Sequence, residues 1–137
     1  MENITIIKKL ISKYYPKLGI NNVVVNNLMY ILSFEDRYIN DILGVPVAYP
    51  LGVYYNSIKD NFHIKEYHGE QDNVHLERIF KQFRDKYPWV NDYSPVDLVK
   101  IVQGYSSWIY SMKEYKEEGI PIGQKLIDNE TVKLPYL

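Results

Sequence analysis

The longest apolar stripe in the chain lies between Ser94 and Met112, and it limits the possible folds more than any other segment. Ser94 is followed by a proline and, three residues on, by a carboxylate, an arrangement typical of a capped helix start. The apolar residues then recur every three or four positions, the spacing of one helix face. We therefore predict one long helix over Ser94–Met112 at the centre of the fold, kinked at Gly104, with Trp108 in the core.

Three further segments have helical spacing. The first starts near the beginning of the chain and ends before Pro16, because a proline ring cannot continue a helix. The second is capped by Asn21 or by the asparagine after it, although its Val23–Val25 run would also suit a strand. The third covers Asp72–Tyr87. A short helix is also predicted at Gly123–Asp128.

The region between Leu43 and Tyr67 has a different composition. Two prolines and clustered aromatic and β-branched residues exclude a regular helix there. We expect a turn, a short helical or extended piece at Val53–Ile58 and a small strand at Phe62–Tyr67. The predicted fold is mainly α: one compact domain over residues 1–137, with five to six helices and at most a small β element in this Gly/Pro/aromatic region.

Composition restricts the class of protein. A chain of 137 residues is long enough to bury a core without stabilising metals or disulfides. The absence of cysteine excludes disulfides, thiolate zinc sites and thiol nucleophiles. The 16 basic and 17 acidic residues give a net charge of -1, which provides no overall field for nucleic acid or anionic lipid. No apolar run reaches the roughly 18–20 residues of a membrane span, and the N-terminal residues lack a secretory pattern. We expect a cytoplasmic protein.

No pattern of catalytic or metal-binding residues is present. His63, His68 and His75 lie close together in the sequence, but their spacing matches no zinc motif, and solvated loop histidines are the favoured interpretation. Ser106 and Ser107 lack the glycines of a nucleophile elbow, and no histidine follows them. The sequence therefore predicts a protein that is not an enzyme, with no catalytic residues, no metal and no cofactor.

Basic side chains of the Asp72–Tyr87 helix could contact phosphates, so a nucleic-acid-binding regulator is one alternative. These side chains are Arg78, Lys81, Arg84 and Lys86. Glu77 and Asp85 dilute the patch, and a solvated helix face is favoured.

Four large aromatic residues fall outside the helical stripes. Tyr49, Tyr54 and Tyr55 lie in the Gly/Pro/aromatic region, and Trp89 lies in the connector after the third helix. Loops on a rigid scaffold concentrate binding residues, and aromatic rings give contact area at low entropic cost. We predict that these four residues form one patch that binds a protein partner. The alternative is that Trp89 packs the connector onto the core.

The order of the motifs resembles that of the Panacea domain, the SocA-like and phage-associated antitoxin family. Its members carry a Lys-Leu-Leu-Tyr-Phe helix, a Trp/Tyr-Gly-Pro-Val segment, a Ser-x-x-Glu-Leu helix before Ser-Pro-Trp, and a closing Pro-Ile. The similar segments here are Asn27–Leu32, Ala48–Tyr54, Ser94–Val99, Ser106–Trp108 and Gly119–Ile122.

This resemblance implies a mostly helical domain inside the cell that neutralises a toxin by direct binding or adapts a partner. Such domains are common on phages and other mobile elements, so an inhibitor of a host or defence protein is the alternative to a toxin–antitoxin pair. The expected partner is a protein in both cases, with no membrane and no small-molecule cofactor involved.

Overall fold

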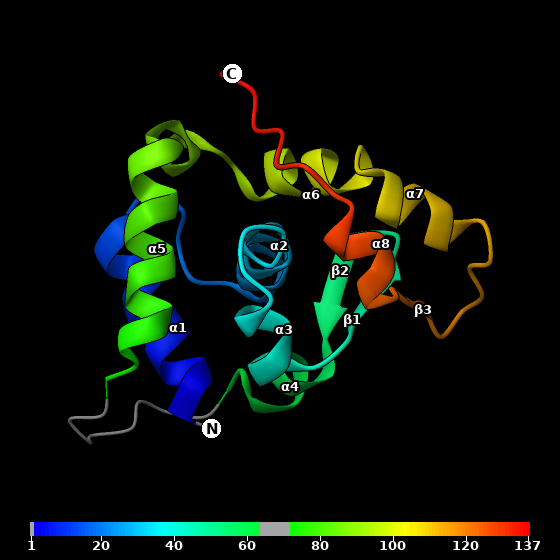
Figure 1. The fold of residues 1–137 in the computed structure, drawn as a ribbon, viewed down its shortest axis with the longest axis horizontal. Helices are drawn as coiled ribbons and strands as arrows, with labels where there is room; N and C mark the ends of the chain where they lie inside the picture. Colours follow the sequence, from blue (N-terminus) through cyan, green and yellow to red (C-terminus); the bar gives the residue numbers. More distant parts are fainter. Residues whose placement is uncertain (1, 64–71) are drawn as a thin grey trace.

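The computed structural model describes residues 2–63 and 72–137 (Figure 1). Within these residues the chain forms eight α-helices, one 3-10 helix and three short strands, so the mainly helical prediction is confirmed. Most of the strand expected at Phe62–Tyr67 lies outside the described residues. In chain order the elements are α1 (Glu2–Tyr14), α2 (Asn22–Leu32), α3 (Tyr38–Leu43), β1 (Pro46–Tyr49), β2 (Gly52–Tyr55), α4 (Asn56–Asn61), α5 (Val74–Lys86), η1 (Pro88–Asp92), α6 (Pro95–Gln103), α7 (Ser106–Met112), β3 (Ile120–Pro121) and α8 (Gln124–Asp128).

Helix α2 is the centre of the molecule, seen end-on in the middle of Figure 1. It begins where the Asn21 side chain accepts a hydrogen bond from the backbone N–H of Val24, at 2.9 Å. Every residue from Val24 to Leu32 is buried, because α2 packs against α5 and α6 and also against β2, α3 and α4. The helical alternative for the Val23–Val25 run is therefore the correct one, and a helix buried on all sides forms the core.

The predicted continuous helix over Ser94–Met112 is wrong. The Ser94 capping box is present and starts α6 as expected. The chain leaves the helix after Gln103, because Tyr105 adopts an extended conformation with φ −79° and ψ 139°. That conformation directs the Tyr105 ring inward, where it is 3% exposed, and α7 begins at the next residue. The central position predicted for this block belongs to α2.

Trp108 lies at the edge of the core and is half-buried. Its indole N–H points at the turn between β1 and β2, 2.7 Å from the carbonyl oxygen of Gly52 and 3.3 Å from that of Tyr49. The ring therefore connects α7 to the hairpin.

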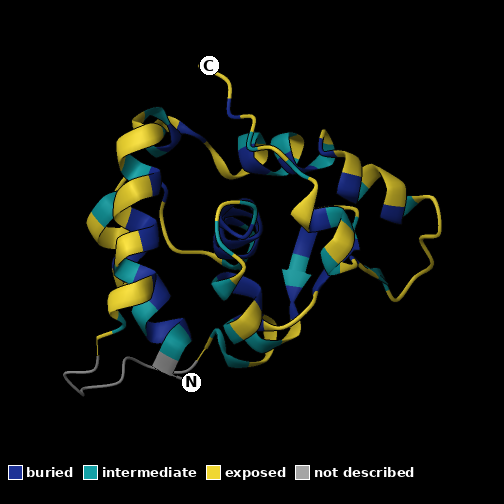
Figure 2. Cartoon of the chain, in the orientation of Figure 1, coloured by how far each residue is buried: buried dark blue, intermediate teal, exposed yellow. Residues whose placement is uncertain are grey.

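Helices α1 and α5 pack side by side on one flank of α2 (Figure 1). The sequence pattern of α5 is confirmed, with its apolar residues turned inward and its charged face exposed (Figure 2). Asn73 caps the helix through the backbone N–H of Leu76, at 3.0 Å. The Tyr15 and Phe83 rings meet edge to face, 6.4 Å apart, across the α1–α5 interface. No helix of the described residues is long and apolar enough to cross a bilayer.

The strands form an antiparallel sheet in the order β2-β1-β3. The β1–β2 hairpin lies in the Gly/Pro/aromatic region, where a small β element was expected. The third strand was not expected: the segment Ile120–Pro121 returns from α7 and pairs with Val47 and Ala48 of β1. Gly119 makes this approach possible, with φ +83° and room for no side chain between Val47 and the backbone of Ala48.

Two asparagines of α2 cover the outer edge of the sheet. The side-chain oxygen of Asn27 accepts from the N–H of Val53 at 3.1 Å, and that of Asn26 accepts from the N–H of Tyr55 at 2.8 Å. Asn27 also donates to the carbonyl of Leu51 at 3.2 Å. These bonds account for polar residues on a buried helix, since they satisfy backbone groups that an edge strand would otherwise leave unpaired.

The opposite edge of the sheet is closed by a proline. The N–H of Ile122 donates to the carbonyl of Pro46, so the alternation of an antiparallel pair directs the Pro121 position away from β1. Proline has no N–H to offer a further strand. Neither edge of this sheet is therefore open to strand addition.

Candidate protein-binding groove

A groove of about 570 Å³ lies between the start of α2, the β1–β2 hairpin and the loop 113–119. Three tyrosines from three different segments line it: Tyr49, Tyr54 and Tyr115. The groove therefore contains two of the four aromatic residues that the sequence analysis selected.

The hairpin register brings Tyr49 and Tyr54 together. Tyr54 lies opposite Val47, two residues before Tyr49, so the two tyrosines share one face of the sheet. Their rings meet edge to face with centroids 5.1 Å apart. Burial, and then the neighbouring Tyr54, raise the pKa of Tyr49, which keeps its hydroxyl neutral.

Both tyrosines are half-buried, and further contacts hold Tyr54 in place. Its hydroxyl donates to the carbonyl of Glu118 at 3.0 Å, which ties the loop 113–119 to the hairpin. On the ring face, the Lys59 ammonium lies 5.3 Å from the ring centroid, within the range of a cation–π contact. The fold therefore positions Tyr49 and Tyr54, which together form the aromatic wall of the groove.

The prediction that Tyr55 faces a partner is wrong. Tyr55 is completely buried, and its hydroxyl donates to the side-chain oxygen of Asn40 at 2.7 Å. Burial raises the pKa of this phenol. Successive residues of a strand point to opposite faces, so Tyr54 and Tyr55 cannot share one surface once they belong to a strand. The sequence of Val53–Ile58 is compatible with either a helix or an extended piece, so it does not by itself reveal this alternation.

Trp89 is not part of the groove, so the four predicted residues do not form one patch. The η1 segment lies between α5 and α6, across α2 from the sheet (Figure 1). The Trp89 indole donates to the carbonyl of Leu134 at 3.0 Å, and its ring packs on Tyr136 with centroids 4.1 Å apart. Trp89 therefore has a packing role, as in the alternative considered for it.

Tyr115 is the groove residue that the sequence analysis missed. It is 36% exposed, in the loop after α7, among residues of mixed charge. Its neighbours follow neither a helical nor a strand period, so nothing in the local pattern distinguishes it. The pairing of β3 with β1 and the bond from Tyr54 to Glu118 bring this loop beside the hairpin.

The histidines that the structure describes are engaged with neighbouring side chains. His75 is 3.0 Å from Asp36 and stacks on Tyr38 with ring centroids 4.0 Å apart. His63 meets the ring of Phe62 edge to face, whereas His68 lies outside the described residues. Among the residues placed by the structure, no group of three or more His, Cys, Asp or Glu side chains could hold a metal ion.

Two of the basic residues considered for phosphate contact make contacts within the chain. Arg84 donates to the carbonyl of Tyr14 at 2.8 Å and lies over the Tyr15 ring. Lys86 pairs with Glu35 at 3.5 Å. These interactions leave a weaker basic surface on α5 than the sequence alone indicates.

Comparison with models of known protein families, with curated proteins and with solved structures finds no match for this chain.

Proposed function

We propose that this chain is a non-enzymatic protein-binding module with an antitoxin-like role, and that it neutralises or adapts its partner by direct binding. The observation that carries the proposal is the groove between α2, the hairpin and the loop 113–119, with its three positioned tyrosines. The resemblance to the Panacea domain supports a toxin as the partner. An inhibitor of a host or defence protein would use the same surface on a different target.

Tyrosine suits a surface that binds protein. Its ring contributes a large contact area with only two rotatable bonds, and its hydroxyl adds hydrogen bonding. Here the Tyr49–Tyr54 contact and the bond from Tyr54 to Glu118 restrict the rings before any partner arrives. Binding then costs less side-chain ordering than binding to a flexible surface would.

The closed sheet edges restrict how a partner is held. Asn26 and Asn27 occupy the edge at β2, and Pro121 closes the edge at β3. A partner therefore contacts side chains in the groove and does not extend the sheet. We expect the binding energy to concentrate on the aromatic wall, as is typical of interface hot spots.

Growth rescue tests this function. Each open reading frame beside the gene is expressed with and without this chain, and growth and complex formation are measured. We expect one product to arrest growth alone, to bind the chain and to be neutralised by it. If no neighbouring product is toxic, or if a toxic one is neither bound nor neutralised, the toxin-binding role is contradicted.

A pair of variants tests the groove itself. Tyr49→Ala combined with Tyr54→Ala removes the aromatic wall and should weaken partner binding at least tenfold. Tyr110→Ala is the matched control, because Tyr110 is 61% exposed on α7 and does not line the groove. Cooperative unfolding of both variants is checked by circular dichroism. Equal loss of binding in the two folded variants would contradict the assignment of the groove.

A further inference from the structure

A second binding surface lies between η1 and α6, where a segment of this chain occupies it. Residues 130–137 have no regular secondary structure and run along α6 (Figure 1). They follow α8 and contact residues that lie 23 to 45 positions earlier in the chain. The segment therefore lies on the domain in the way that an extended peptide lies on a receptor.

Three aromatic side chains donate to three consecutive carbonyl oxygens of this segment. The Tyr105 hydroxyl donates to Lys133 at 2.9 Å, the Trp89 indole donates to Leu134 at 3.0 Å, and the Tyr93 hydroxyl donates to Pro135. The Tyr105 oxygen also accepts from the N–H of Lys133 at 3.1 Å. Since all these bonds go to the main chain, any extended segment of the same shape can make them.

Side chains at alternate positions supply selectivity. Val132 packs against the core, Leu134 is only 8% exposed, and the Tyr136 ring lies on that of Trp89. Between the last two, Pro135 restricts the residue before it to extended backbone. The surface thus recognises an apolar residue, a proline and an aromatic residue in a row, on an extended chain.

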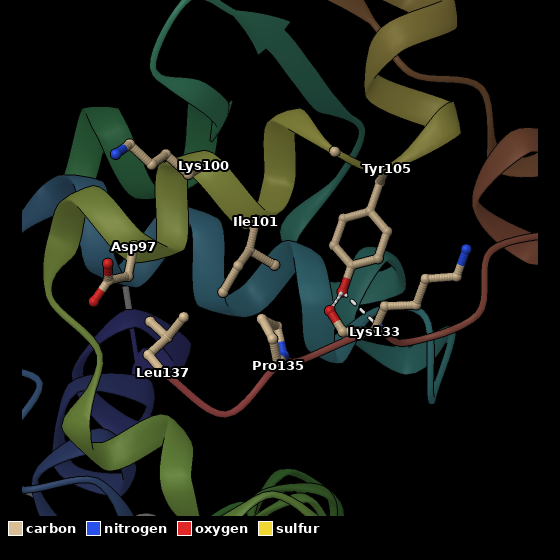
Figure 3. A pocket seen from close by; sticks show the side chains of 8 residues that line it. Asp97, Lys100, Ile101, Tyr105, Lys133, Pro135 and Leu137 are labelled. Carbon is tan, nitrogen blue, oxygen red and sulfur yellow. Dashed lines mark hydrogen bonds between the residues drawn. The ribbon is translucent and has the colours of Figure 1, made fainter.

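The segment does not fill this surface. A mainly apolar cavity of about 380 Å³ remains between α6 and the segment, with Ile101 on its α6 side (Figure 3). Gly104 also lines it. Lys133, Pro135 and Leu137 of the segment form its other side, and their side chains are exposed. A segment with a larger apolar side chain at the position of Lys133 would make contacts that the chain's own residue does not make.

We propose that the surface between η1 and α6 is a binding groove for an extended apolar–proline–aromatic segment of a protein partner, and that residues 132–136 occupy it in cis. This goes beyond the role of the tyrosine groove and is independent of it. Partner binding here requires release of the chain's own segment. The apparent affinity for the partner is therefore reduced by the fraction of molecules in which the segment is still bound in cis.

Release of the cis segment in the full chain tests the proposal. The double variant Leu134→Ser, Tyr136→Ser removes both anchors, and a fluorescent peptide with the sequence of residues 130–137 is the probe. We expect the variant to bind the peptide at least tenfold more tightly than the unmodified chain, as measured by fluorescence anisotropy. A control peptide with serine at the same two positions should not bind, and adding Trp89→Ala to the released variant should weaken binding.

Three outcomes would overturn the proposal. The first is a folded double variant that binds the peptide no better than the control peptide. The second is a double variant that does not fold, which would make the segment part of the core. The third is an unmodified chain that exchanges segments with a second copy and forms a dimer by light scattering.

A measurement on the unmodified chain keeps the proposal testable in every case. The Lys133 amide is held by the Tyr105 hydroxyl, so its hydrogen exchange reports how often the segment opens. We expect it to exchange at least tenfold faster than the core amides of α2. Exchange at the same rate as α2, by global unfolding alone, would contradict a releasable segment.

Discussion

The β1–β2 hairpin and the segment 130–137 both depend on side chains that bond to backbone, but only the hairpin has buried strand N–H groups that are paired with side chains of the central helix. In the hairpin, buried asparagine oxygens of α2 accept from the N–H groups of Val53 and Tyr55. In the segment, aromatic side chains donate to carbonyl oxygens, as Trp89 does to Leu134. The hairpin acceptors belong to the central helix, whereas Trp89 and its neighbours lie in short connectors.

This difference predicts different local stability. A buried N–H without a partner is costly. Within the folded state, the hairpin therefore cannot move away from α2 without leaving the N–H groups of Val53 and Tyr55 unpaired. Tyr136, by contrast, is 77% exposed, and the carbonyl of a released residue finds water at once. We therefore expect the hairpin to open only with the whole fold and the segment to open by itself.

Gly52→Ala should have the largest effect. Gly52 has φ +96°, and an added Cβ would lie 2.1 Å from the side-chain oxygen of Asn27. The substitution combines backbone strain with a clash in the covered edge, so we expect a loss of about 2–6 kcal/mol in the free energy of unfolding. Urea unfolding followed by circular dichroism measures it.

Gly44→Ala separates the two causes. Gly44 has a similar φ, +91°, but no atom lies within 4 Å of an added Cβ. It should lose only the strain contribution, about 1–3 kcal/mol. If both variants lose the same amount, the clash with Asn27 contributes nothing and the tight packing of α2 on the hairpin is contradicted.

Asn27→Leu tests the polar contacts of the hairpin directly. The change keeps the size of the side chain but leaves the N–H of Val53 and the carbonyl of Leu51 without this partner. We expect a loss of about 2–4 kcal/mol, since each buried unsatisfied group costs roughly 1–3 kcal/mol. Asn61→Leu is the control, because the bond that the described residues give to the Asn61 side chain is to the carbonyl of Ser57, within its own helix turn. Equal losses of unfolding free energy for the two variants would show that the bonds of Asn27 to the β2 edge of the sheet do not contribute specially to stability.

Much of the fold could be predicted from local pattern. The capped start at Ser94, the α5 stripe and the small β element in the proline-rich region all depend on neighbours in sequence. The break at Tyr105 could not be predicted this way. Its ring is held by residue Lys133, far along the chain, and an uninterrupted apolar stripe does not reveal such a contact.

The candidate site was predictable in part for the same reason. Tyr49 and Tyr54 lie outside the helical stripes, which predicts a role at the surface, and the groove does contain them. The burial of Tyr55 follows from strand alternation, which requires knowing that residues 52–55 form a strand. Tyr115 joins the groove through β3, a two-residue strand that leaves almost no trace in the sequence.

Rising pH should ionise Tyr105, which contacts the segment, before it ionises Tyr55 of the hairpin. Burial raises the pKa of Tyr105 to about 12, while the bond to Lys133 opposes this shift, and burial also raises the pKa of Tyr55. A phenol whose pKa is raised on folding stabilises the fold below its unfolded pKa, near 10. This contribution disappears as the pH rises through the folded pKa. We expect a loss of about 2 kcal/mol from Tyr105 between pH 10 and pH 12.

Ultraviolet absorbance of tyrosinate and unfolding curves across this range measure the effect. Tyr105→Phe should flatten the decline of stability with pH, and Tyr55→Phe should flatten it only at higher pH. Because the segment opens by itself, Tyr105 should ionise before circular dichroism changes. Ionisation of Tyr105 only together with unfolding of the helices would show that the segment is as firmly held as the hairpin.

Trp89→Phe should have the smallest effect and addresses the segment alone. Phenylalanine keeps a ring against Tyr136 but removes the donor to the carbonyl of Leu134. A hydrogen bond of this kind contributes about 0.5–1.5 kcal/mol, and a released carbonyl is solvated, so we expect a loss near the lower end of that range. Hydrogen exchange of the Lys133 amide should nevertheless become faster, because the segment opens more often while the helices stay folded. A loss of unfolding free energy as large as that of Asn27→Leu would mean that the Leu134 carbonyl depends on its partner as strongly as the Val53 N–H does. The predicted difference in local stability between the hairpin and the segment would then be wrong.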